Sequence, residues 1–161
     1  MNVSQGQTYQ TIAPAWVARA LLIDPAATNP AHPVIGTRCW TTDLPETTEY
    51  QNDLPACVVS DIGSNPMPGA NTIAVQGLMQ LRIFGGSRKI ADCWRTWHKI
   101  RDRLLNSNGR EYTITELDCR ARWLWAIESG IPEEIRKHPA TGWPELNCIV
   151  QYAVQGVAKE N

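Results

Sequence analysis

Few side chains in this 161-residue chain have the type and spacing that catalysis or metal binding requires. The histidines are His32, His98 and His138, and no two of them lie at the short helical spacing that places two imidazoles on one metal ion. No serine has the flanking glycines of a hydrolase nucleophile. The sequence therefore predicts a protein that is not an enzyme, with no catalytic residue, no metal site and no cofactor.

The cysteines are odd in number, and no two of them form a C-x-x-C pair. Four fall in predicted strands and one lies on the apolar side of a predicted helix. We therefore interpret them as small core side chains in a reducing compartment. They are Cys39, Cys57, Cys93, Cys119 and Cys148.

One glycine-rich turn could bind an anion. Gly85-Gly86-Ser87-Arg88-Lys89 follows a predicted strand and precedes a predicted helix, where backbone N–H groups and nearby cations can hold a phosphate. The turn lacks the G-x-x-x-x-G-K-[ST] pattern of a phosphate-binding loop. An ordinary turn in which Ser87 caps the helix is the competing interpretation. An anion- or nucleotide-binding protein that uses residues 85–89 is thus an alternative function.

The net charge of −1 is unlike that of a dedicated nucleic-acid-binding protein. Residues 1–80 carry two basic and six acidic side chains, whereas residues 81–161 carry thirteen basic and ten acidic ones. This asymmetry is either chance or a sign of complementary charges across a repeated head-to-tail contact. No apolar run approaches the ~18 residues of a membrane span, and the N-terminus lacks the pattern of a signal peptide. We expect an intracellular product with no membrane partner.

Residues 72–105 predict a long strand that leads into an amphipathic helix. Between residues 73 and 83 the odd positions are apolar or glycine, which is the two-residue period of a half-buried strand. Residues 87–105 then place apolar side chains at helical spacing, and Trp94 and Trp97 are expected to fill the space between helix and sheet. Arg101 falls inside the apolar arc, either with its stem on the core and its head in water or at a contact with another subunit. The solvent side is expected to hold Asp92, Arg95, Thr96, Lys99, Asp102 and Arg103.

The remaining elements follow from the same two periodicities. A short helix begins at Pro14 and ends at Asp24, and strands are predicted at residues 34–41, 55–62, 110–114, 119–128 and 146–155. The strand at 119–128 places Trp123, Trp125 and Ile127 on one face, although Leu117, Ala121, Leu124 and Glu128 would also fit a helix. The turn formers of residues 63–71 join two strands into an extended hairpin with a floppy tip. Residues 42–53 form a long acidic loop, and residues 129–142 form another loop with one turn at 133–137.

These elements predict an α+β fold, a mostly antiparallel mixed sheet with an extended hairpin and two main helices packed on one face. Residues 1–13 are expected to be a flexible N-terminal segment and residues 14–161 a single domain.

The order of elements resembles the tail terminator (tail completion) proteins of long-tailed bacteriophages. The resemblance covers most of residues 34–157 and is one of layout with short motifs. The residues that carry it are Leu54-Pro55-Ala56-Cys57-Val58-Val59, Gln80-Leu81-Arg82-Ile83-Phe84-Gly85, and Trp143-Pro144 before Tyr152.

The resemblance implies a structural virion protein that assembles as a homo-hexameric ring. Such a ring caps the tail tube and joins it to the head–tail connector protein, and genome DNA passes through its lumen without sequence-specific binding. The resemblance thus implies a place in the tail or neck of a virion that is made in a host cytoplasm. A head-completion or connector-adaptor ring is the alternative within the virion.

Six side chains are the candidates for subunit or partner contacts. They come from the acidic loop, the hairpin tip, the long strand and the apolar arc of the helix. A hairpin that extends past its own core can add to a neighbour's sheet, and a head-to-tail contact that closes makes a ring. The candidates are Asp43, Glu46, Glu49, Met67, Arg82 and Arg101.

Overall fold

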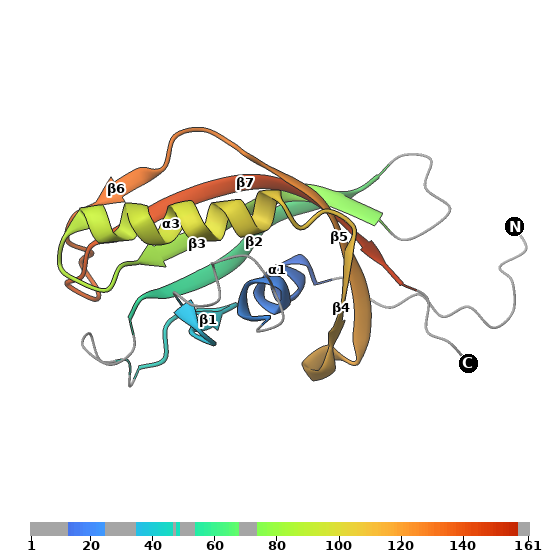
Figure 1. The fold of residues 1–161 in the computed structure, drawn as a ribbon, viewed down its shortest axis with the longest axis horizontal. Coiled ribbons are helices and arrows are strands. Elements are labelled where there is room, and N and C mark those ends of the chain that lie inside the picture. The colour runs from blue at the N-terminus through green and yellow to red at the C-terminus, as the bar shows by residue number, and fades with distance from the viewer. Residues whose placement is uncertain (1–12, 25–34, 47, 49–53, 68–73, 158–161) are drawn as a thin grey trace, which may run out of the picture.

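In the computed structural model of the chain, the described residues are 13–24, 35–46, 48, 54–67 and 74–157. They form one curled sheet with helices on its inner face, so the predicted α+β fold with a mostly antiparallel sheet is confirmed (Figure 1). The segment predicted to be flexible lies outside these residues, apart from Ala13. The helices are α1 (Pro14–Ile23) and α3 (Ile90–Leu105), with a single turn of 3-10 helix, η1 (Thr115–Leu117).

The sheet has the strand order β1-β2-β3-β7-β5-β4, and β6 also pairs with β7. Only the contact between β1 and β2 is parallel among the described pairs. The strands are β1 (Cys39–Trp40), β2 (Ala56–Pro66), β3 (Ala74–Phe84), β4 (Arg110–Ile114), β5 (Cys119–Glu128), β6 (Glu133–Ile135) and β7 (Glu145–Gly156).

Strand β7 is the centre of the sheet. One of its edges pairs with β3 over ten residues, from Ala74↔Gln155 to Ile83↔Leu146. Its other edge pairs with β5 toward its C-terminal end and with β6 at its N-terminal end. The alternation predicted for residues 146–155 is confirmed, because the even positions from 146 to 154 are all buried and belong to the core.

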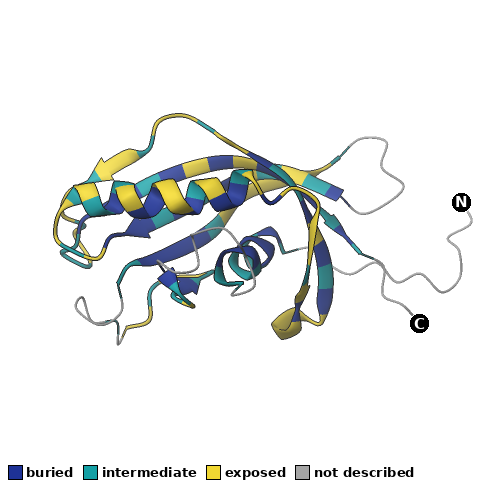
Figure 2. Cartoon of the chain, viewed as in Figure 1, coloured by how far each residue is buried: buried dark blue, intermediate teal, exposed yellow. Residues whose placement is uncertain are grey.

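Both helices pack on the inner face of the curl and share one hydrophobic core with it (Figures 1 and 2). Helix α3 lies along β3, β7 and β5, and α1 lies in the curl against β1, β2, β4 and β5. The largest fully buried side chains include Trp97 of α3 and Trp123 of β5. The Trp123 ring stacks on Tyr152 at 6.1 Å between centroids, and its indole N–H donates to the carbonyl of Leu104 at 3.0 Å.

The side of α3 that was expected to face solvent is partly buried instead. Arg103 is only 3% exposed because α1 covers it. Its Nε donates to the carbonyl of Leu21 at 3.2 Å, and its Nη2 donates to the Tyr112 hydroxyl at 3.0 Å. The Arg103 cation thus lies at the C-terminal end of α1, where the helix dipole favours a positive charge. Thr96 is also buried, and its hydroxyl donates to the Asp92 carbonyl within the helix at 2.9 Å.

The hairpin is longer in its strands than predicted. Strand β2 continues through Pro66, so residues 63–66 belong to the strand and not to the tip. The six residues 61–66 are all exposed. The register of β2 against β3 shifts between Asp61 and Gly63. The Tyr152 hydroxyl donates to Asp61 Oδ1 at 2.5 Å, which ties this part of the hairpin to β7.

A bulge in β5 corrects the predicted facing of its side chains. The sequence alternation placed Trp123, Trp125 and Ile127 on one face. The register against β7 shifts between Trp123 and Trp125, so one strand has an extra residue there. A shift of one residue exchanges the two faces of a strand. Trp123 is therefore buried, whereas Ile127 is 52% exposed.

Three further boundaries differ from the prediction. The strand predicted at residues 34–41 is confirmed only at Cys39–Trp40, because Gly36 turns the chain with φ +57°. The loop predicted at residues 129–142 contains the short edge strand β6. Helix α3 begins at Ile90 rather than at Ser87, whose hydroxyl accepts the N–H of Lys89 and donates to Asp92.

We predict that Gly85→Ala destabilises the fold, because α3 begins against this glycine. A Cβ at Gly85 would lie 2.6 Å from the backbone nitrogen of Cys93 and 2.7 Å from the carbonyl carbon of Asp92. Backbone atoms must then move, at an expected cost of about 1–3 kcal/mol in the free energy of unfolding measured with urea.

The control for this experiment is Gly86→Ala. A Cβ at Gly86 would meet only Pro55 Cδ, at the ordinary distance of 3.6 Å. The expected change is within about 0.5 kcal/mol. Equal urea midpoints for the two variants would contradict the close approach at Gly85.

Candidate interaction surface

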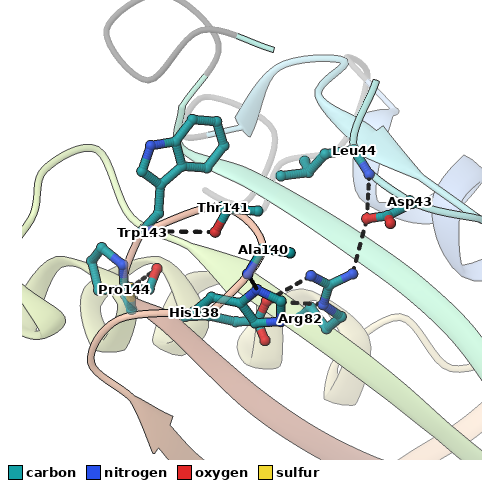
Figure 3. Close-up of polar contacts among 10 residues, drawn as sticks. Asp43, Leu44, Arg82, His138, Ala140, Thr141, Trp143 and Pro144 are labelled. Carbon is teal, nitrogen blue, oxygen red and sulfur yellow. Dashed lines mark hydrogen bonds and ion pairs between the residues drawn. The ribbon is translucent and has the colours of Figure 1, made fainter. Parts of the chain in front are cut away.

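The outer face of the sheet, opposite the helices, divides into a covered part and an open part. At the covered end Arg82 of β3 projects outward beside Asn147 of β7, its register partner. Arg82 Nε lies 2.9 Å and Nη2 lies 2.8 Å from Glu145 Oε1, and Nη1 lies 3.0 Å from Asp43 Oδ1 (Figure 3). The guanidinium also lies over the Phe84 ring, with Cζ 5.3 Å from its centroid. One cation therefore joins two strands and the acidic loop.

The loop at residues 138–143 is folded beside this ion-pair cluster. The His138 N–H donates to the Trp143 carbonyl at 2.9 Å, and the Gly142 N–H donates to the His138 carbonyl at 2.7 Å. The imidazole Nδ1 of His138 accepts the N–H of Ala140 at 3.1 Å. Trp143 then meets Phe84 edge-on, with ring centroids 6.3 Å apart. A surface hollow of about 300 Å³ separates this loop from residues 43–46 and 48.

Burial and pairing act in opposite directions on the charges of this cluster. Burial disfavours the Arg82 cation, but its bonds to Glu145 and Asp43 outweigh burial and raise the pKa of Arg82. The N–H of Leu44, at 2.8 Å, is the main cause of a lowered pKa for the Asp43 carboxyl, and Arg82 adds to it. A lowered pKa means that this contact stabilises the fold above the ordinary pKa of aspartate and is lost as the pH falls through the lowered value.

The open part of the outer face has no charged side chain. The strand registers arrange it in two rows across β2, β3, β7 and β5 and a third row across β2, β3 and β7. Arg82 and Glu133 border it at one end and Arg122 at the other. We name this surface the uncharged array, and its rows are Asn65, Gln76, Ala153 and Trp125; Gly63, Leu78, Gln151 and Ile127; and Ser60, Gln80 and Ile149.

The uncharged array combines exposed apolar side chains with a hollow. Leu78, Ile127 and Ile149 are 37%, 52% and 37% exposed, which is unusual for large aliphatic side chains that lie close together. A hollow of about 310 Å³ opens beside Leu78. It is lined by Asn65, Gln76, Gly77, Leu78, Trp125, Gln151 and Tyr152.

The candidate contact residues that the structure describes do not form one surface. Asp43 and Arg82 form an ion pair, and Glu46 lines the same hollow as Asp43. Arg101 of α3 lies elsewhere and pairs with Glu128 at 3.5 Å and with Asp102 at 3.8 Å. Met67 follows β2, where its N–H donates to the Ala74 carbonyl at 3.0 Å, and Glu49 lies outside the described residues. Their role in contacts between subunits stays a prediction.

The turn at residues 85–89 is arranged unlike an anion site. Ser87 donates to the Asp92 carboxylate, and Asp92 lies in the first turn of α3. Ser87 is the main cause of a lowered pKa for Asp92, so a negative charge already lies beside the helix start. A second anion there would meet repulsion.

Sequence reasoning missed the uncharged array, although its signal is present. In residues 76–80 of β3 and 149–153 of β7, the outward positions hold only amide and apolar side chains.

Within the described ranges, no group of three or more His, Cys, Asp or Glu side chains could hold a metal ion. In the same ranges, no helix has the length and apolarity to cross a membrane.

Comparison with known proteins shows the fold of the chain but no family. No known family profile matches the chain, and no curated protein matches it. A similar solved chain comes from the structure "Virion of native gene transfer agent (GTA) particle". The TM-score is 0.58 at 9% sequence identity, over 88% of this chain and 94% of that chain. At this identity the likeness shows a shared fold.

We predict that Arg82→Ala lowers the stability of the protein strongly. The substitution leaves Glu145, which is 1% exposed, without its cation, and an unpaired buried charge costs about 3–5 kcal/mol. Because part of the Arg82 side chain reaches solvent, we expect about 3 kcal/mol in urea unfolding.

Two variants make this test specific. Arg101→Ala removes longer ion pairs from a more exposed side chain and is expected to cost less than about 1 kcal/mol. The double variant Arg82→Met with Glu145→Leu removes both charges and is expected to recover most of the loss. The internal ion pair would be rejected as a stabilising contact if Arg82→Ala cost no more than Arg101→Ala.

Proposed function

We propose that the chain is a structural, non-catalytic virion protein of a phage-like particle. The carrying observation is the shared fold with a chain of a gene transfer agent virion, which extends over 94% of that chain. Because the match leaves little of either chain unpaired, the likeness concerns the whole architecture. The order of elements, which resembles that of phage tail terminators, points in the same direction.

Within the virion we propose the role of tail terminator. Copies of the chain form a hexameric ring that caps the tail tube and joins it to the head–tail connector, and genome DNA passes through the lumen without sequence-specific contacts. The structure offers two features that suit this role. Residues 61–66 of β2 form an exposed strand at the edge of the sheet, and the uncharged array exposes Leu78, Ile127 and Ile149 on the outer face.

A connector-adaptor ring on the head side uses the same features. The two roles differ in the structure to which the ring binds. The purified chain, mixed separately with isolated tails and isolated heads of the same particle, is expected to bind one end of the tail tube. Gold labelling and electron microscopy show the position. Binding to heads alone would support the connector-adaptor role instead, and binding to neither heads nor tails would reject both roles.

The same assay tests Arg101 as a subunit contact. If the Arg101 head group bridges copies as well as pairing with Glu128, Arg101→Ala is expected to reduce the number of capped tails several-fold while the urea midpoint changes little. Unchanged capping would leave Arg101 with its internal partners alone.

A further inference from the structure

One apolar side chain of this protein is almost completely in water. Ile131 is 92% exposed, more than any other large hydrophobic residue of the described chain. It lies between Gly130, which has φ +80°, and Pro132, in the loop that joins β5 to β6. Pro132 restricts the backbone of Ile131 to extended conformations. The isoleucine therefore projects without cover from its own chain.

The uncharged array offers a place for such a side chain. Its hollow of about 310 Å³ is large enough for one branched aliphatic side chain, and Leu78 and Trp125 give it apolar walls. The side chains of Gln76 and Gln151 at its rim can bond to the backbone of an incoming loop. The loop residues Ser129, Gly130, Ile131 and Pro132 carry no charge, as the array carries none.

We propose that Ile131 of one copy inserts into the Leu78–Trp125–Gln151 hollow of the next copy. The contact is heterologous, because the inserted side chain and the receiving hollow are different parts of the surface. A heterologous contact that repeats closes into a ring or continues as a filament. The inference rests on the proposed function only in the expectation that copies of the chain assemble.

The size of the array indicates how strong the contact is. The two rows across four strands and the third across three cover at most about 400 Å² by ordinary strand spacing, whereas a stable interface needs about 800 Å² from each partner. One such contact therefore does not hold two copies together for long. In a closed ring each copy makes the contact twice, and a tube beneath the ring holds the copies near one another. We therefore expect copies of the chain to pair weakly in free solution and to assemble on a tail tube.

A nucleic acid is a poor occupant of the array, since the array has no lysine or arginine to neutralise phosphates. The other possible arrangement is a two-fold contact in which two arrays meet face to face. Because the array carries no charge, no like charges would meet in such a contact. It would leave Ile131 outside the interface.

Disulfide trapping distinguishes these arrangements. The five native cysteines are all buried, so introduced cysteines provide the reactive thiols. The variants Ile131→Cys and Leu78→Cys are mixed at high concentration with oxidised glutathione, which accepts the two electrons and leaves as two thiols when the disulfide forms. We expect the mixed dimer in at least tenfold greater yield than from Ile131→Cys mixed with Leu117→Cys. Leu117 is the matched control, since it is 41% exposed on η1, outside the array.

Each outcome has one meaning. A mixed-dimer yield equal to that of the control pair overturns the proposal, and so does a dominant homodimer of Leu78→Cys, which would indicate two arrays face to face. A chain that carries both cysteines is expected to give a ladder that ends at the closed ring. Capping of tails without cross-linking would reject this contact and keep the proposed function, whereas cross-linking without binding to tails or heads would do the reverse.

Discussion

The backbone pairing of β7 along both of its edges is the constraint on which the rest of the structure depends. Strand β3 pairs with one edge of β7, and β5 and β6 pair with the other. The position of β7 therefore sets which side chains of its neighbours lie side by side on each face of the sheet. The inward side chains of β7 meet α3 in a single core. Its outward side chains set the spacing of the uncharged array and place Asn147 beside Arg82. A shift in β7 would therefore disturb the core and the outer face together.

The two parts of the outer face follow different rules. At one end, the buried Glu145 pairs with Arg82, which also pairs with the exposed Asp43, and residues 138–143 fold beside this cluster. Beyond Asn147, residues 76–80 of β3 and 149–153 of β7 place only amide and apolar side chains at their outward positions.

The regular elements could be predicted because each of them follows one period over many residues. Strand β3, strand β7 and helix α3 all lie where two-residue or helical periodicity placed them. Arg103 was placed in solvent because the pattern of α3 cannot show that α1 packs on its polar side. Strand β6 is three residues long and begins with two glutamates, so it has no pattern of its own. The uncharged array needs the register of four strands, which no single stretch of sequence contains.

The bulge in β5 has a consequence for how this surface can change. The extra residue near Leu124 decides whether the following aromatic and aliphatic side chains enter the interior or face outward. The hydrophobicity of residues 125–127 does not determine this orientation, because the same side chains could lie in the core or on the outer face. The number of residues at this position therefore decides which side chains face outward, and one insertion or deletion there would change several outward positions at once.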